Sequence, residues 1–143
     1  MRAWRAYIVG TELLLQQLHR ELQAAHGMTI SDYEVLVQLS ERDGGRMRMT
    51  ELAGRVASSK SRLSHQITRM EKAGLVRRLT CPDDARGILA ELTEQGMQAL
   101  HTAAPTHVAG VRTHLIDLLT EPDHEALATI FERILKHLEA TPN

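Results

Sequence analysis

Positive charge in this chain is concentrated in one central block. Between Arg46 and Gly87 there are ten lysines and arginines against four acids, a net charge of +6, whereas the rest of the chain carries seven bases and fourteen acids, a net charge of −7. The near-neutral total of −1 therefore hides a strong separation of charge. Such clustering is costly unless a partner neutralises it, and duplex DNA, with one negative charge per about 1.7 Å of axis, is the commonest partner of that kind. We expect the block to bind a polyanion.

The scarcity of aromatic residues favours a double helix over single-stranded nucleic acid. One Trp, two Tyr and one Phe leave few side chains on which unstacked bases could stack. A catalytic site is not indicated, because the chain shows neither a nucleophile with an aligned base nor a glycine-rich phosphate loop. The serines between Ser58 and Ser64 are explained as capping and contact residues. We therefore predict no enzymatic activity and no cofactor.

Two short helices joined by a tight turn are predicted inside the basic block. Thr50 and Ser59 can each cap a helix, and Gly74 can end the second helix, which runs to about Ala73, in the left-handed conformation. Helical periodicity separates an apolar inner stripe of this second helix from a polar outer face. The stripe comprises Leu63, Ile67 and Met70, and the outer face comprises Ser61, His65, Thr68 and Lys72, flanked by Arg62 and Arg69. This is the pattern of a helix-turn-helix unit, whose second helix enters the major groove of DNA.

Strands are predicted on either side of this helix pair. Residues 46–49 alternate basic and apolar side chains like a small strand. Residues 75–80 and 88–92 have the pattern of two further strands around a turn at 82–87. The resulting hairpin would form a wing beside the helix-turn-helix.

Further helices are predicted before and after the helix pair and its strands. The first covers 3–25, and the second runs from a Ser31 cap, with Glu34 in a capping box, to Gly44. The third runs from a Thr93 cap toward Leu119, and the fourth follows Pro122. Pro105 predicts a kink or a break in the third of these helices, because proline removes a helical hydrogen bond. The small winged unit cannot cover all the apolar faces of the terminal helices, so we expect a second copy of the chain to cover them.

Three stretches of the sequence resemble the MarR-type winged-helix transcriptional regulators. They are Met49-Thr-Glu-Leu-Ala-Gly-Arg-Val56 followed by Ser59-Lys-Ser-Arg-Leu-Ser64; Arg69-Met-Glu-Lys-Ala-Gly-Leu-Val76; and Asp84-Ala-Arg86 with Leu92-Thr93 and Gly96, which is similar to the family's wing signature. The resemblance covers essentially the whole chain. It implies a mainly α (α+β) fold with a single domain over 1–143, a winged helix-turn-helix at about 30–92, and dimerisation helices at about 1–25 and 93–140.

The function implied by the resemblance is sequence-specific binding of double-stranded DNA by a transcriptional regulator, most often a repressor. A homodimer would place two winged units on successive major grooves of a pseudo-palindromic operator, with half-sites about 34 to 36 Å apart. Two alternatives stay open: a winged-helix module that binds proteins, and an architectural DNA binder without sequence preference. Arg62, Arg69 and Arg86 on the groove-facing surfaces argue against the first, and a steep salt dependence without sequence preference would identify the second.

The predicted DNA contacts lie on the second helix of the pair. Base-edge contacts are assigned to Ser61, Arg62 and His65, because the N-terminal part of a recognition helix reaches deepest and arginine can bond guanine at O6 and N7. Contact with phosphates alone is the alternative for each of these residues. The expected phosphate contacts are Lys60, Ser64, Thr68 and Arg69.

The wing contributes two further candidate residues. Arg86 resembles the family's minor-groove arginine, and the enhanced negative potential of a narrow groove explains such a role. Asp84 is an acid where DNA would repel one, so we expect it to pair with and orient an arginine of the hairpin. A plain surface salt bridge, worth about 0 to 1 kcal/mol, is the alternative for this pair.

Cysteine and histidine content gives little reason to expect redox or metal chemistry. The single cysteine, Cys81, excludes an internal disulfide and fits a cytoplasmic protein, and no apolar run is long enough to span a membrane. The family's peroxide sensors carry their cysteine near the N-terminus, so the resemblance does not extend redox sensing to Cys81. His107, His114 and Asp117 could share a helix face but lack the convergent spacing of a zinc site, so no metal is predicted.

Control by a small-molecule effector is also implied by the resemblance. Members of the family often bind phenolic or lipophilic ligands between the dimer helices and the winged unit. The residues that would line such a crevice are Trp4, Tyr7, His19, Met28 and Tyr33. Packing in the core or in the dimer explains each of them equally well, so an effector stays an open alternative.

Overall fold

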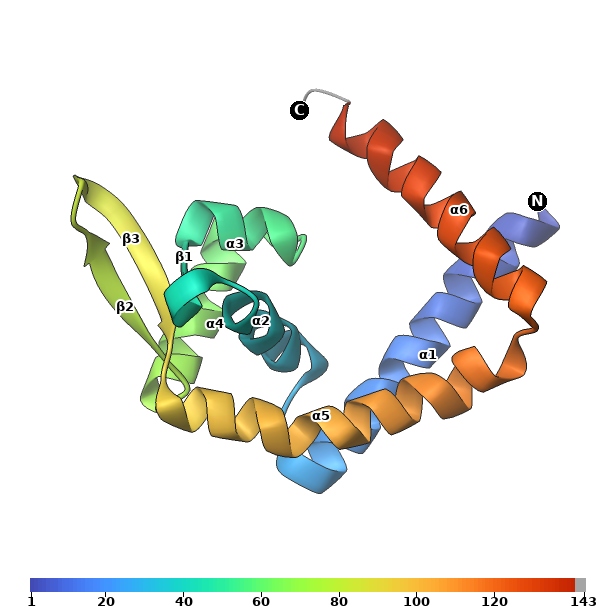
Figure 1. The fold of residues 1–143 in the computed structure, drawn as a ribbon, viewed down its shortest axis with the longest axis horizontal. Coiled ribbons are helices and arrows are strands. Elements are labelled where there is room, and N and C mark those ends of the chain that lie inside the picture. The colour runs from blue at the N-terminus through green and yellow to red at the C-terminus, as the bar shows by residue number, and fades with distance from the viewer. Residues whose placement is uncertain (141–143) are drawn as a thin grey trace. The chain divides into compact units, whose positions relative to one another are not determined.

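The computed structural model describes residues 1–140 and shows a mainly helical chain with one small antiparallel sheet (Figure 1). Its elements in order are α1 (Arg2–His26), α2 (Ile30–Ser40), the 3-10 turn η1 (Asp43–Gly45), β1 (Arg46–Arg48), α3 (Met49–Arg55), α4 (Lys60–Lys72), β2 (Val76–Cys81), β3 (Asp84–Leu92), α5 (Glu94–His114), the 3-10 turn η2 (Ile116–Leu118) and α6 (Glu121–Glu139). Helices α3 and α4 form the predicted pair, and β2 with β3 forms the predicted wing. The expected winged helix-turn-helix fold is confirmed.

The chain divides into two compact units, Met1–His107 and a second unit that begins at Val108. The first unit contains α1 to β3 and most of α5, and therefore every residue predicted to contact DNA. The second unit contains the end of α5, η2 and α6. The boundaries of the winged part at about 30–92 and of the flanking dimerisation helices remain a prediction.

The core of the first unit holds α4 with a fixed inner face. Its largest fully buried side chains are Leu22, Leu36, Leu39, Leu52, Leu63, Ile67, Met70, Val35 and Val76, which come from α1, α2, α3, α4 and β2. Leu63, Ile67 and Met70 are the inner stripe predicted for α4, so that prediction is confirmed. Because burial of one such side chain is worth roughly 1.5–3 kcal/mol, rotating α4 until the stripe met water would cost several kcal/mol.

The sheet has the strand order β1-β3-β2, and the β2–β3 hairpin projects from the helices as a wing (Figure 1). Glu91 of β3 lies in register with Arg46 of β1 and with Arg77 of β2. The buried Glu91 side chain pairs with both arginines, so one row of charges crosses all three strands. β3 begins at Asp84, earlier than the predicted residue 88, because pairing continues beyond a register shift beside Cys81 and shortens the turn.

Two predicted helix starts are wrong. Thr29, and not Ser31 with Glu34, caps α2: its hydroxyl accepts a backbone N–H three residues further on at 3.0 Å. Helix α3 begins at Met49 without a side-chain cap, so Thr50 is not its cap. In both places the helix begins two residues earlier than predicted. Before α2 the neighbouring hydroxyls of Thr29 and Ser31 both fit the local capping pattern.

Pro105 lies inside α5 without interrupting it. The helix continues from Glu94 to His114, so the break predicted as one of two outcomes does not occur. Proline removes one helical hydrogen bond and crowds the preceding turn. Burial of Leu100 and Ala103 on the same helix favours the continuous conformation.

The end of α4 is tied to the start of α5. Gly74, after α4, adopts φ +77°, the left-handed conformation predicted for it. Thr93 accepts the N–H of Gly96 at 3.0 Å, which confirms it as the cap of α5. Its hydroxyl donates to the Gly74 carbonyl at 2.6 Å and its N–H to the Leu75 carbonyl at 3.1 Å. Gly96 packs so closely that a Cβ atom there would lie 2.0 Å from the Leu75 carbonyl oxygen.

Helix α6 forms most of the second unit and leaves apolar side chains exposed. It begins with a capping box in which Thr120 and Asp123 exchange hydrogen bonds, and those from Thr120 hold the pKa of Asp123 below its usual value. The exposed apolar residues are Ile130, Ile134, Leu135 and Leu138, with exposed fractions between 44% and 61%. No helix in the described part of the chain is both long and apolar enough to cross a membrane.

Candidate nucleic-acid interface

The outer face of α4 presents all the contacts predicted for this helix to solvent. They are Lys60, Ser61, Arg62, Ser64, His65, Thr68 and Arg69, and each is exposed. The hydroxyl of Ser59 accepts the N–H of Arg62 at 3.2 Å, which confirms the predicted cap and holds the first turn in shape. The structure therefore gathers these side chains on one accessible surface. Their contact with DNA stays a prediction.

Ion pairs divide the ten basic residues of the central block into two groups. Six have a carboxylate partner: Arg46, Arg48, Arg55, Arg69, Arg77 and Arg78. Within residues 1–140, no such pair is formed by the remaining four, Lys60, Arg62, Lys72 and Arg86. These four lie on α4 and on the wing, so the basic residues of the central block that lack a carboxylate partner are confined to the elements that a winged helix-turn-helix presents to DNA.

Arg69, predicted to contact a phosphate, is paired with Asp32 of α2. Its Nη2 donates to Asp32 Oδ1 at 2.7 Å, and Gln66 Nε2 donates to the same oxygen at 2.9 Å. The Asp32 side chain is only 13% exposed and lies in the first turn of α2, where the helix dipole favours a carboxylate. Two donors from α4 thus converge on one carboxylate and fix α4 against α2.

Two hydroxyls on the exposed face of α4 already have partners within the protein. Thr68 Oγ1 donates to the carbonyl oxygen of Ser64 at 3.0 Å. Ser64 Oγ accepts from Arg78 Nη2 at 3.2 Å. Ser64 therefore keeps its hydroxyl proton available for a phosphate oxygen, whereas Thr68 can only accept a hydrogen bond while its own bond lasts.

Asp84 orders the tip of the wing through two contacts. Its Oδ1 accepts the backbone N–H of Arg86 at 3.0 Å, and its Oδ2 lies 3.7 Å from Arg48 Nη1. The arginine partner was expected within the hairpin, and the structure corrects this to Arg48 of β1. Arg48 Nη2 also lies 3.4 Å from Cys81 Sγ, so this guanidinium joins β1 to the hairpin. The side chain of Arg86 itself is exposed.

Cys81 and the candidate metal ligands His107 and Asp117 each contact other residues of the protein. Cys81 is buried. The rings of His107 and Tyr33 pack at a tilt of 36° with centroids 4.4 Å apart, and burial lowers the pKa of His107. Asp117 pairs with Arg112 at 2.8 Å. Across residues 1–140, no three His, Cys, Asp or Glu side chains are grouped so that they could hold a metal ion.

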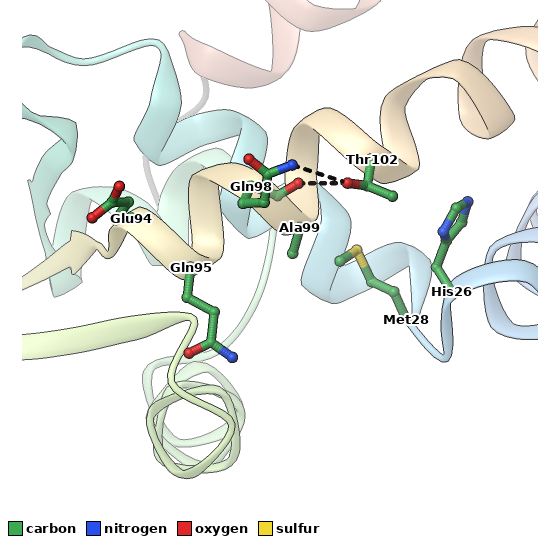
Figure 2. Close-up of a pocket in the computed structure, with 7 residues that line it drawn as sticks. All are labelled: His26, Met28, Glu94, Gln95, Gln98, Ala99 and Thr102. Carbon is green, nitrogen blue, oxygen red and sulfur yellow. Dashed lines mark hydrogen bonds between the residues drawn. The ribbon is translucent and has the colours of Figure 1, made fainter.

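Two cavities of the first unit are large enough for a small molecule. One of about 630 Å³ is lined by His26, Met28, Glu94, Gln95, Gln98, Ala99 and Thr102 (Figure 2). Gln98 and Thr102 hydrogen-bond to each other along α5. The other, of about 550 Å³, is lined by Leu15, Ile30, Ser31, Glu34, Val56, Ala57, Ser58, Arg62 and Gln66.

Neither of these two cavities is lined by all five residues predicted to line an effector crevice. Met28 borders the cavity of Figure 2, but it is also part of the core, as is Tyr33. His19 Nδ1 accepts the N–H of Ile30 at 3.4 Å. Trp4 is 59% exposed on α1. An effector crevice formed by these five residues remains a prediction.

Four polar residues that shape the surface were not singled out from the sequence: Asp32, Arg48, Glu71 and Arg78. Each acts through a partner on another element, as Asp32 does with α4 and Arg48 with the wing. Local periodicity identifies a polar face but not which of its charges meet across the fold. The basic block contains Arg48 and Arg78, and nothing in their spacing distinguishes them from the unpaired cations.

Comparison with known proteins places this fold and surface in a family. The model of the MarR family matches residues 28–88, which run from the loop before α2 into β3. A Bacillus cereus protein named as an uncharacterized HTH-type transcriptional regulator is 30% identical over 123 residues, covering 86% of this chain and 80% of that protein. The chain belongs to the MarR family. The resemblance seen in the sequence is thereby confirmed.

Solved structures of MarR-family transcriptional regulators match nearly the whole chain. AbsC from Streptomyces coelicolor is 50% identical with a TM-score of 0.92, and the match covers 97% of this chain and 93% of AbsC. Sco3205 from the same organism, solved in complex with DNA, is 42% identical with a TM-score of 0.93, and the match covers 97% and 87% of the two chains. This MarR-family regulator thus shares the winged-helix fold of both.

Proposed function

We propose that this MarR-family regulator binds a pseudo-palindromic operator in double-stranded DNA as a homodimer and represses transcription from the promoter that it occupies. One observation carries the proposal: the unpaired cations of the central block lie on α4 and on the wing, while each of its six other basic residues is paired with an acid. An electrostatic surface of this kind matches the two elements of a winged helix that approach a duplex. The DNA complex of the 42%-identical Sco3205 supports the same ligand class.

Within this proposal the exposed residues take separate roles. Ser61, Arg62 and His65 read base edges from the N-terminal half of α4. Lys60 and Ser64 hold phosphates beside them, and Thr68 and Arg69 add contacts further along the helix when their internal bonds rearrange. Arg86 enters the minor groove at the wing, with Asp84 holding the backbone there.

Selection of bound sites from random duplex DNA tests the proposal. The expected product is an inverted repeat whose half-sites are about one helical turn apart, because two-fold protein symmetry imposes two-fold symmetry on the site. Enrichment of no sequence, together with steeply salt-dependent binding, would instead identify an architectural DNA binder. Absence of binding to any duplex at low salt would favour the protein-interaction module.

The direction of regulation requires a separate measurement. Transcription in vitro from a template that carries the selected site should fall as the protein is added, because an occupied promoter excludes polymerase. An increase in transcript would show activation and contradict the repressor part of the proposal alone.

Control by an effector is supported by the cavity of about 550 Å³, because Arg62 and Gln66 of α4 border it. A ligand changes operator affinity only by the difference in its own affinity for the DNA-bound and free forms. We therefore expect small amphipathic phenols that raise the melting temperature of the protein to change its affinity for the selected site. Compounds that bind without changing DNA affinity would argue against regulation through this cavity.

A further inference from the structure

Arg78 lies on β2, the first strand of the wing, and its side chain reaches to α4. Nη1 donates to Glu71 Oε1 at 2.8 Å, and Nη2 donates to the Ser64 carbonyl oxygen at 2.7 Å and to Ser64 Oγ at 3.2 Å. The backbone N–H of Arg78 donates to the second Glu71 oxygen at 2.8 Å. One arginine therefore holds two residues of α4 that are seven positions, about two turns, apart.

The charge of Arg78 is compensated within the protein. Glu71 accepts from both the backbone and the side chain of Arg78, and these bonds, with the backbone bond the largest cause, hold the pKa of Glu71 below its ordinary value. The Arg78 side chain is 26% exposed, and that of Glu71 33%. Lys60, in contrast, is exposed and has no carboxylate partner in the described chain. Lys60 can therefore pair with a phosphate directly, whereas Arg78 would first have to leave Glu71.

The contacts of Arg78 with Ser64 restrict the orientation of α4 relative to the wing. Ser64 is exposed on the outer face of α4, and Arg78 holds both its backbone carbonyl and its hydroxyl. A planar guanidinium bonded at both ends restricts the rotation of α4 relative to the wing, as well as the rotamer of Ser64. Asp32 restrains the other flank of α4 through Gln66 and Arg69.

We propose that Arg78 is a positioning residue for DNA recognition: it sets the angle between α4 and the wing so that both engage one duplex together. This inference rests on the proposed DNA-binding function. The competing role is direct contact with a phosphate, because Arg78 also borders a cavity of about 190 Å³ with Lys60, Ser64, Met49, Thr50 and Ile88. The two roles predict different dependences of binding on salt.

The test compares specific and non-specific DNA binding over a range of salt concentrations. The slope of log K against log salt is negative, and each phosphate contact that is lost reduces its magnitude by about 0.9. This magnitude is the slope referred to below. Arg78→Gln should weaken binding to the selected operator by about tenfold, leave binding to unrelated duplex nearly unchanged, and leave the slope unchanged. Lys60→Gln should lower the slope by about 0.9. Arg77→Gln is the matched control, since it removes the same charge from the same strand but its partner is Glu91; the ratio of specific to non-specific affinity should stay as in the wild type.

A variant of the acid separates electrostatics from positioning, because only loss of positioning changes the ratio of operator affinity to non-specific affinity. Glu71→Ala removes a negative charge near the DNA surface, so electrostatics alone would strengthen binding to every duplex. Loss of positioning instead lowers the ratio of operator affinity to non-specific affinity, by about as much as in Arg78→Gln. Arg78→Lys keeps the charge without the planar fork, so it should not restore that ratio.

Three outcomes would overturn the inference. A slope lowered by about 0.9 in Arg78→Gln, with rescue by Arg78→Lys, would make Arg78 a phosphate contact. Equal loss of specific and non-specific affinity, with a lowered melting temperature, would make its role only structural. A wild-type protein that binds operator and unrelated duplex equally, or binds no duplex, would overturn the proposed function and this inference with it.

Discussion

Arg86 and Arg48 belong to neighbouring strands, β3 and β1, and have different surroundings. Arg48 contacts Asp84 and Cys81, whereas the Arg86 side chain is exposed and forms no ion pair within the described chain. A guanidinium without a partner can neutralise a phosphate or enter a narrow minor groove. One that is already paired must first give up its partner. At the scale of the residue, the partner of a basic side chain therefore determines its role more than its place in the sequence.

We predict that Arg86→Ala weakens operator binding by about 1–3 kcal/mol and leaves the fold intact. The side chain is exposed, and the bond between Asp84 and the backbone N–H at position 86 does not need the guanidinium. A gel-shift titration at fixed salt measures the affinity, and a thermal melt checks the fold. An unchanged affinity would refute the role given to Arg86.

At the scale of the element, the position of α4 depends on neighbours at both flanks and at its end. Asp32 holds it to α2, Arg78 holds it to β2, and Thr93 ties the residues after it to α5. Buried apolar side chains fix which face of α4 points inward. The polar contacts add direction, because a hydrogen bond has a preferred angle and an apolar contact does not.

We predict that Gly96→Ala destabilises the protein by about 1–3 kcal/mol. The added methyl group would lie 2.0 Å from the Leu75 carbonyl oxygen, so α5 would have to move away from the end of α4. Urea denaturation measures the free energy of unfolding. Gly10→Ala is a matched control, because a Cβ atom at that helical position meets nothing within 4 Å. Equal stability of the two variants would contradict the close packing at Gly96.

We predict that His107 makes the first unit less stable in mild acid. Burial lowers its pKa in the folded state, and the opposing charge of Glu34 is the smaller effect. The unfolded chain, with a histidine pKa of about 6.5, then binds more protons than the folded one, so this stability contribution is full above about pH 6.5 and is lost as the pH falls through the folded pKa.

The variant His107→Phe separates this effect from the other histidines. It keeps a ring against Tyr33 and removes the buried Nδ1, which has no hydrogen-bond partner in the described structure. Urea denaturation at pH 7.5 and at pH 5.5 should show a smaller loss of stability in the variant than in the wild type. The same loss in both proteins would mean that His107 does not contribute.

The sequence predicted most elements of the first unit because their signals are local. The inner stripe of α4, the Ser59 and Thr93 caps and the left-handed Gly74 are each visible within a few residues, and all are confirmed. The start of α2 was misplaced because neighbouring hydroxyls satisfy the same capping pattern. Continuity of α5 at Pro105 could not be predicted, since tertiary packing compensates for the lost hydrogen bond.

From the sequence, the predicted site residues of α4 could be placed on its exposed side, but their hydrogen-bond partners within the protein could not be identified. Helical periodicity places Arg69 beside the outer face of α4, Ser64 was predicted as a phosphate contact, and both side chains are exposed in the structure. That Arg69 pairs with Asp32, and Ser64 with Arg78, depends on how α2, α4 and β2 meet in space. No pattern within one element contains that information, and whether each side chain contacts DNA remains a prediction.

At the scale of the whole molecule, exposed apolar surface on both terminal helices suggests a partner copy. Trp4 and Leu13 of α1 are 59% and 58% exposed, and α6 exposes a row that includes Ile134 and Leu135. Such surface is costly in water, and closed two-fold dimers are the commonest way for a chain to cover it. This cost supports the homodimer of the proposed function.

We predict that the wild-type protein sediments as a dimer and that Ile134→Glu with Leu135→Glu shifts it to a monomer. Two carboxylates in an apolar interface would lose their hydration without gaining partners. Operator affinity should fall with the loss of the dimer, because only one winged unit can then bind at a time. Sedimentation velocity and the gel shift together measure both effects. A monomeric wild-type protein would contradict the predicted assembly.

Helix α5 runs without interruption from the first unit into the second, and its first turn is fastened to the end of α4 through Thr93 and Gly96. A shift of this first turn would therefore move the residues that end α4, because hydrogen bonds and close packing join the two. Substitutions in the first turn of α5 would then change which operators the protein accepts, although they lie outside α4 and the wing. Evolution could alter the target of such a regulator while leaving every residue of its DNA-facing surface as it is.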